Sequence, residues 1–193
     1  MFSRKFFGVS LPRTGTSSLA YAIRELGLVT EHYLSRRELD ILPRVDFAND
    51  FPIPLMYKQL DEQFKGSRFL FTDRNVDDWL DSYELHLERT GHLTIGNWHE
   101  YNMEMFGTLK FDRKIFRNQF LRHREDVFEY FKDRPEALLV LDMPYTAESW
   151  KEICKFIGVK PTIYGGFPHK CGSYSVTNPH CPQDERNPDP QWR

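Results

Sequence analysis

Two segments of the sequence carry side chains suited to holding phosphate groups. The first, residues 8–19, reads Gly-Val-Ser-Leu-Pro-Arg-Thr-Gly-Thr-Ser-Ser-Leu. Gly15 permits close approach of the backbone, Arg13 supplies a planar cation, and the start of a following helix offers N–H groups that the helix cannot pair. Hydroxyl groups come from Thr14, Thr16, Ser17 and Ser18. These groups predict a binding loop for a phosphate or a related anion.

This loop differs from the G-x-x-x-x-G-K-[ST] loop of nucleotide triphosphatases, which needs a lysine directly after its second glycine. Thr16 follows Gly15 here, and six residues separate Gly8 from Gly15. A small-molecule kinase is therefore the less favoured enzyme class. A polar turn that is merely rich in threonine and serine is the alternative without function.

The second segment contains Arg74 and Ser82. Arg74 stands at the end of a predicted strand, and Ser82 comes seven residues after Asn75, about two helical turns. The guanidinium and the hydroxyl can then face the same side and hold a second phosphate beside the first loop. Taken singly, an ion pair of Arg74 with Asp77 or Asp78 and a solvated Ser82 are equally good interpretations.

Apolar runs and their periodicity predict strands that alternate with helices. Predicted strands cover residues 6–10, 28–33, 68–72 and 137–141, and predicted helices cover 17–26, 55–64, 75–87, 112–132 and 147–157. Residues 90–107 show no clear period, so we expect a surface excursion that could close over a ligand. The alternation predicts an α/β three-layer sandwich with a central parallel sheet, whose ligands bind at the carboxyl ends of the strands.

Length and composition indicate one folded domain. We expect the α/β domain to cover residues 1–170 and residues 171–193, with four prolines, to form an irregular tail. A formal charge of -2 provides no field for nucleic acid or an anionic membrane. No apolar stretch approaches the roughly 20 residues that span a bilayer.

The cysteines and the first residues predict a cytoplasmic protein. Cys154, Cys171 and Cys181 are odd in number, and no apolar signal-peptide core precedes them, so we expect reduced thiols.

Together the two segments resemble the sulfotransferase superfamily, which uses 3'-phosphoadenosine 5'-phosphosulfate (PAPS). Residues 12–19 are similar to its 5'-phosphosulfate loop, and Arg74 with Ser82 to its 3'-phosphate motif. Residues 138–143, 149–158 and 167–169 resemble its C-terminal third. The resemblance spans residues 8 to about 169. It implies a P-loop nucleotide-kinase-like fold, PAPS as co-substrate without a metal ion, and sulfuryl transfer to a hydroxyl or amine of a small-molecule or glycan acceptor.

Within the superfamily, the loop and Asp50-Phe51-Pro52 resemble a branch with Pro-Arg-Thr-Gly-Thr and Asp-x-Pro segments. The cytosolic steroid and phenol enzymes have lysine where Arg13 stands. Their Arg-Lys-Gly element near the C-terminus has no counterpart, although Lys170 or Arg186 could substitute. The chain is short for the family, which leaves a homodimer with a shared acceptor pocket open.

The resemblance also implies roles in the reaction. Arg13 and the loop hydroxyls would stabilise charge on the leaving phosphate, with Arg13 acting electrostatically because arginine does not readily give up its proton. Asp50 is the first candidate for the general base and His32 the second. A turn residue at Asp50 and a surface residue at His32 are the alternatives, and a nucleotide-binding protein without turnover remains a third class.

Three further residues have structural interpretations. We expect His123, on the apolar face of its helix, to be a buried and hydrogen-bonded core residue. Trp79 and Tyr83, four residues apart, are expected to pack within the protein rather than stack on adenine.

Overall fold

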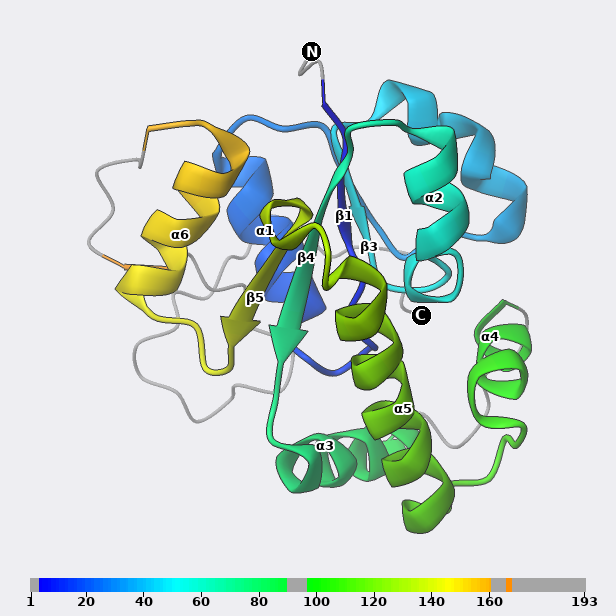
Figure 1. The fold of residues 1–193 in the computed structure, drawn as a ribbon. Helices are drawn as coiled ribbons and strands as arrows, with labels where there is room; N and C mark the ends of the chain where they lie inside the picture. The colour runs from blue at the N-terminus through cyan, green and yellow to red at the C-terminus, as the bar shows by residue number, and fades with distance from the viewer. Residues whose placement is uncertain (1–3, 90–96, 161–165, 168–193) are drawn as a thin grey trace.

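The computed structural model describes residues 4–89, 97–160 and 166–167. In this part of the chain, five parallel strands form one sheet in the order β2-β3-β1-β4-β5 (Figure 1). The strands are β1 (Phe6–Gly8), β2 (Thr30–His32), β3 (Phe47–Asn49), β4 (Arg68–Asp73) and β5 (Leu138–Asp142).

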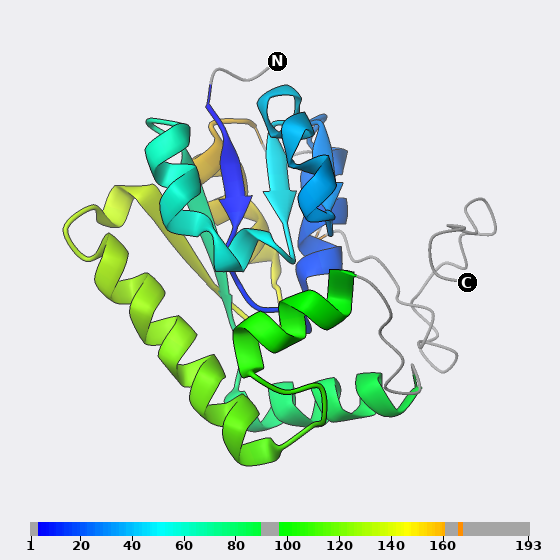
Figure 2. The same cartoon turned by 90° about the vertical axis from the view of Figure 1, so that its right-hand side faces the viewer.

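Helices cover both faces of the sheet (Figures 1 and 2). One apolar cluster joins α1 (Thr16–Glu25) and α6 (Ala147–Ile157) to one face, and a second joins α2 (Tyr57–Gln63) and α5 (Arg113–Phe131) to the other. The 3-10 helices are η1 (Arg36–Arg44), η2 (Ile53–Leu55) and η3 (Pro135–Ala137). This arrangement confirms the predicted three-layer α/β sandwich.

A third apolar cluster lies below the carboxyl ends of the strands. It contains α3 (Val76–Arg89) and α4 (Asn97–Phe106), and Figure 1 shows α3 crossing under the sheet. Trp79 and Tyr83 are fully buried there, which confirms their packing role. His123 of α5 is also buried, and its Nε2 lies 2.7 Å from the carbonyl oxygen of Val9, as predicted.

Strand order decides which loops meet. The connection through α1 leaves β1 on one face of the sheet, whereas the connection through α2 passes β1 on the other face. In doubly wound sheets, ligands bind at such a switch point, outside the carboxyl ends of the strands. Gly8 pairs with Asn49 of β3 and with Leu70 of β4, so the segments that follow these three strands begin side by side.

Two predictions of local structure were wrong. No strand was predicted between residues 33 and 68, but the chain forms η1 and then β3 directly before Asp50. Three residues that include alanine and asparagine give no strand pattern, and β3 is stabilised by pairing with a strand on each side.

The second error concerns residues 90–107, where no helix was predicted and residues 97–106 form α4. Tertiary packing of Tyr101 and Phe106 stabilises this helix, which its weak periodicity did not reveal. The predicted tail, Cys171, Cys181, Lys170 and Arg186 lie outside the described residues. Cys154 is a buried free thiol. No helix in the described ranges is both long and apolar enough to cross a bilayer.

Gly8 is a sensitive point of the sheet, because a Cβ there would lie 2.6 Å from the Cβ of Asn49. We expect Gly8→Ala to lower the free energy of unfolding by about 1–3 kcal/mol, since neither strand can move without breaking a ladder. Gly166→Ala is the control, because nothing lies within 4 Å of its added Cβ. Urea denaturation measures both, and equal stability of the two variants would contradict this account of β1 and β3.

Candidate active site

The loop between β1 and α1 is held by hydrogen bonds to its own carbonyl oxygens. The Thr14 hydroxyl donates to Leu11 O (2.7 Å), Trp79 Nε1 to Pro12 O (2.8 Å) and Arg74 Nη1 to Arg13 O (2.6 Å). The first backbone bond of α1 runs from Leu19 N to Gly15 O. With the carbonyl groups bound to protein, the N–H groups of the first turn are left to receive an anion.

Gly15 brings the loop after β5 against this turn. Its φ is 86°, and a Cβ on it would lie 2.9 Å from Met143 Sδ and 3.0 Å from Tyr145 Cε2. The Tyr145 hydroxyl bonds to Thr72 Oγ1 at 2.7 Å and lies 3.4 Å from Gly15 O. The ends of β1, β4 and β5 therefore meet at Gly15.

Two guanidinium groups lie together at this point. Arg13 Nε donates to Ser82 Oγ over a long 3.4 Å, and Arg74 binds the carbonyl of Arg13. Burial lowers the pKa of Arg74, and the charge of Arg13 lowers it further. Two neighbouring cations in a half-buried place repel each other, and an anion between them removes that cost.

The ion-pair alternative for Arg74 is not realised in the described part of the chain. Asp77 pairs instead with Arg113 and Arg117 of α5, and Asp78 acts on Arg74 only at longer range. The structure thus brings Arg13, Arg74 and Ser82 together, as the spacing predicted.

A hydrogen-bonded network joins the loop to the ends of β2 and β3. The Thr16 hydroxyl donates to Asp50 Oδ2 at 2.6 Å, and Ser17 Oγ lies 3.0 Å from His32 Nε2. His32 Nε2 is 3.8 Å from Asp50 Oδ2, and His32 Nδ1 is 3.0 Å from Asn49 Oδ1. Both candidate bases therefore lie beside the predicted anion loop.

The loop hydroxyl groups are engaged with protein in different ways. Thr14 is buried and its hydroxyl stabilises the turn rather than facing a ligand. The hydroxyls of Thr16 and Ser17 bond to Asp50 and His32, and Ser18 lies half-buried on the first turn of α1. Direct anion contacts by the Thr16 and Ser17 hydroxyls require an exchange of these bonds.

Left-handed backbone conformations mark the same place. Arg13, Tyr33 and Asp50 have φ of 71°, 64° and 67°, and they are the non-glycine residues with positive φ among those described. Each follows one of the three strands β1, β2 and β3. Such residues cost about 1–3 kcal/mol each and cluster at functional sites.

Sequence reasoning missed several residues of this site. Asn49 is fully buried, and its Nδ2 donates to Thr16 O at 2.8 Å, so it fixes the start of α1 relative to His32. The sequence offered no signal for Asn49, because the strand that it ends has no strand pattern of its own. Tyr145 and the indole of Trp79 hold the loop through contacts that no local pattern reveals.

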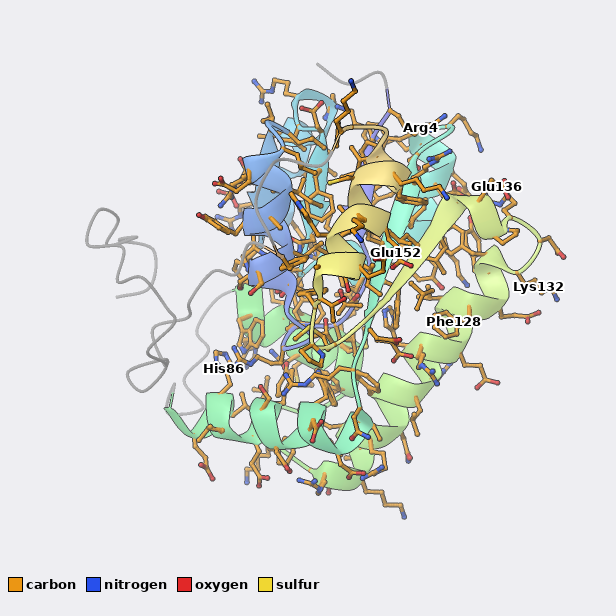
Figure 3. The ribbon with its side chains drawn as sticks, turned by 90° about the vertical axis from the view of Figure 1, so that its left-hand side faces the viewer. Arg4, His86, Phe128, Lys132, Glu136 and Glu152 are labelled. Atoms are coloured by element: carbon orange, nitrogen blue, oxygen red, sulfur yellow. The ribbon has the colours of Figure 1, made fainter. Side chains whose placement is uncertain are left out.

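Aromatic residues form the wall next to Asp50. Burial raises the pKa of Tyr33 and of Tyr83, and the Asp50 carboxylate adds to both shifts. His86 points from α3 toward the sheet in Figure 3 and packs edge-on against Trp98. Burial, and then the nearby Arg13 charge, lowers the pKa of His86 to about 4.

Metal ligation has no candidate in the described ranges, where no three residues among His, Cys, Asp and Glu gather closely enough to hold an ion. The polar groups that do converge are two guanidinium groups, the helix start and the His32–Asp50 pair. They suit a phosphorylated ligand and a proton transfer beside it.

Comparison with known proteins identifies the class. The sulfotransferase domain family matches residues 35–173, more than half of the chain, and this chain belongs to that family. The match includes Asp50, Arg74 and Ser82, whereas the loop of residues 8–19 precedes it. No curated protein matched the sequence.

Two solved structures are similar in fold. A sulfotransferase from Alicyclobacillus acidocaldarius aligns with a TM-score of 0.59 and 15% identity, covering 90% of this chain and 88% of that one. Mouse sulfotransferase SULT7A1, solved as a complex with PAP, aligns with a TM-score of 0.51 and 17% identity, covering 84% of this chain and 61% of the mouse chain. At these identities the likeness establishes the fold.

The low pKa of His86 predicts acid sensitivity. The folded protein resists protonation of His86 down to about pH 4, while the unfolded chain takes up that proton near pH 6.5. The unfolded state binds more protons in this window, so the free energy of unfolding falls as the pH drops from 7 to 5. Allowing for the partial exposure of His86, we expect a loss of about 1 kcal/mol.

His86→Gln should remove this part of the pH dependence in denaturation curves at pH 7 and pH 5. The control is His99→Gln, because His99 is exposed on α4. An unchanged pH dependence in His86→Gln would show that His86 is not the responsible group.

Proposed function

We propose that this protein transfers a sulfuryl group from PAPS to a hydroxyl or amine acceptor. The supporting observation is the meeting of Arg13, Arg74 and Ser82, which come from two separate strand-to-helix junctions. One doubly phosphorylated nucleotide can bridge these junctions. The fold and family support sulfotransferase chemistry, and PAP in the mouse neighbour supports the choice of nucleotide.

The 5'-phosphosulfate is assigned to the first turn of α1. The N–H groups of Thr16, Ser17 and Ser18 would bind its oxygens, and the lack of a side chain on Gly15 lets the nucleotide approach the backbone. The 3'-phosphate is assigned to Arg74 and Ser82, whose guanidinium and hydroxyl already share the neighbourhood of Arg13. An anion at each place would also separate the two cations.

The transfer step depends on charge stabilisation. As the bond between sulfur and the bridging phosphate oxygen breaks, that oxygen gains negative charge, and Arg13 and the helix start would stabilise it. A bond forms at the same time between sulfur and the acceptor oxygen or nitrogen. In-line positioning of these atoms supplies much of the rate enhancement.

Asp50 is assigned as the group that takes the acceptor proton. It is held at the end of β3 by its left-handed backbone, by Phe51 N bonding to Oδ1 at 2.7 Å and by the Thr16 hydroxyl at Oδ2. Thr16 lies on the first turn of α1, so a base at Asp50 would be next to the sulfuryl group.

Nucleotide binding tests the assignment of the donor site. A hundredfold excess of PAP over its dissociation constant stabilises a folded protein by about 2.7 kcal/mol, which corresponds to a rise in melting temperature of about 5–10 °C here. We expect this rise with PAP and little with ATP and Mg²⁺. Equal stabilisation by both would support the kinase alternative.

Removal of the Arg74 side chain should weaken the binding of PAP, whereas removal of an exposed arginine elsewhere should not. We expect Arg74→Ala to bind PAP about 10- to 100-fold more weakly, the effect of losing a charged hydrogen bond. The matched control is Arg122→Ala, because Arg122 is an exposed arginine of α5 that pairs with Asp126. PAP titrations by calorimetry measure both, and equal affinities would remove Arg74 from the site.

If Asp50 is the base, its replacement should slow turnover without weakening nucleotide binding. We expect Asp50→Asn to bind PAP nearly as wild type and to transfer radiolabelled sulfate from PAPS to a panel of phenols, alcohols and amines about 10²- to 10⁴-fold more slowly. Asp126→Asn, an exposed change on α5, is the control. Wild-type turnover in Asp50→Asn would exclude Asp50 as the base.

A further inference from the structure

His32 lies between the donor loop and the candidate base. Its Nε2 is 3.0 Å from Ser17 Oγ and 3.8 Å from Asp50 Oδ2, and its Nδ1 is 3.0 Å from Asn49 Oδ1. These contacts join α1, β2 and β3 at one imidazole ring. The way protons are shared among them determines what the ring can do.

Asn49 determines which ring nitrogen carries the proton. Its Nδ2 donates to Thr16 O at 2.8 Å, so the amide orientation is fixed and Oδ1 faces His32. An amide oxygen only accepts hydrogen bonds, and therefore Nδ1 of His32 must be the protonated nitrogen. Nε2 of the neutral ring then carries the lone pair, and the Ser17 hydroxyl donates to it.

Ser17 has a single hydroxyl proton. When that proton is donated to a phosphate oxygen of the donor, it cannot also be donated to His32. Ser17 is exposed on the first turn of α1, where the 5'-phosphosulfate is assigned. Occupation of the loop would thus release the lone pair of Nε2, which lies 3.8 Å from Asp50 Oδ2.

We infer that donor binding frees Nε2 of His32 from the Ser17 hydroxyl, and that Nε2 then receives the acceptor proton through Asp50. This inference rests on the proposed function. The proton leaves the acceptor for Asp50 as the bond from the acceptor atom to sulfur forms, and the electron pair of the breaking sulfur–oxygen bond stays on the phosphate. Asp50 passes the proton to Nε2 and returns to the carboxylate. His32 becomes an imidazolium between that carboxylate and the newly charged product.

The surroundings of His32 suit this charge change. Among the described residues, Asp50 is the carboxylate within ion-pair distance of His32, whereas Ser17 of α1 and Asn49 of β3 are neutral. The guanidinium of Arg24 in α1 donates hydrogen bonds to the carbonyl oxygen of Thr30 in β2, the strand that also carries His32. Asn49 acts through His32 and is a positioning residue, since it sets the tautomer without reaching the acceptor.

Nitrogen NMR of the full chain tests the switch. Long-range proton–nitrogen spectra of the ¹⁵N-labelled protein, with His32→Gln assigning the ring, should show Nδ1 protonated and Nε2 as a hydrogen-bonded acceptor. Ser17→Ala lacks the hydroxyl donor, so its spectrum gives the reference position of the Nε2 signal without that hydrogen bond. Saturating PAP should move the wild-type Nε2 signal to the position seen in Ser17→Ala, and exposed His99 on α4 should not respond.

The outcomes separate the two proposals. A free protein with Nε2 protonated, or PAP that binds and leaves the Nε2 signal unchanged, would overturn the switch while leaving the donor site intact. PAP that does not bind at all would overturn the proposed function, and the switch would fall with it, although the tautomer could still be read in the free protein.

A kinetic variant checks the relay independently. Glutamine at position 32 can still bond to Ser17 and Asn49 but cannot take up a proton. We expect His32→Gln to keep PAP affinity within about twofold and to lose about 10²-fold in the sulfation rate of whichever panel acceptor the wild type uses. A rate equal to wild type, or a loss of PAP affinity that accounts for the whole effect, would count against the relay.

Discussion

The site depends on three donors that bind consecutive carbonyl oxygens of the loop after β1. Thr14 binds Leu11, Trp79 binds Pro12 and Arg74 binds Arg13. Two of these bonds tie the loop to α3 and to the residue after β4, and the third closes the loop on itself. The N–H groups at the start of α1 have no partner within the helix and can bind an anion. Two of the donors come from the second strand-to-helix junction, so the bonds that shape the loop also position its partner site.

Parallel strand order makes this arrangement possible. β1 lies between β3 and β4, and the connections through α1 and α2 pass on opposite faces. The loop after β1 therefore has Asp50 on one side and Arg74 on the other. Family membership and the similar folds of known sulfotransferases agree with this α/β arrangement.

Two hydroxyl groups of the loop are bonded to other side chains of the site. The hydroxyls of Thr16 and Ser17 bond to Asp50 and His32, so a ligand must exchange these bonds rather than add new ones. The net gain of each exchanged hydrogen bond is small, and most affinity would come from charge neutralisation at Arg13 and Arg74. The same exchange is what could link donor binding to the state of the base.

The sequence alone determined the α/β class, most strand and helix positions, and the loop residues with Arg74 and Ser82. These features depend on local periodicity and on the residue types that bind anions. Tertiary structure alone decided that β3 and α4 exist, because pairing on two sides and burial of Tyr101 and Phe106 outweigh weak local preferences. It also decided that Asn49 orients His32 and that three hydroxyls bond to protein, since these contacts join residues far apart in the chain.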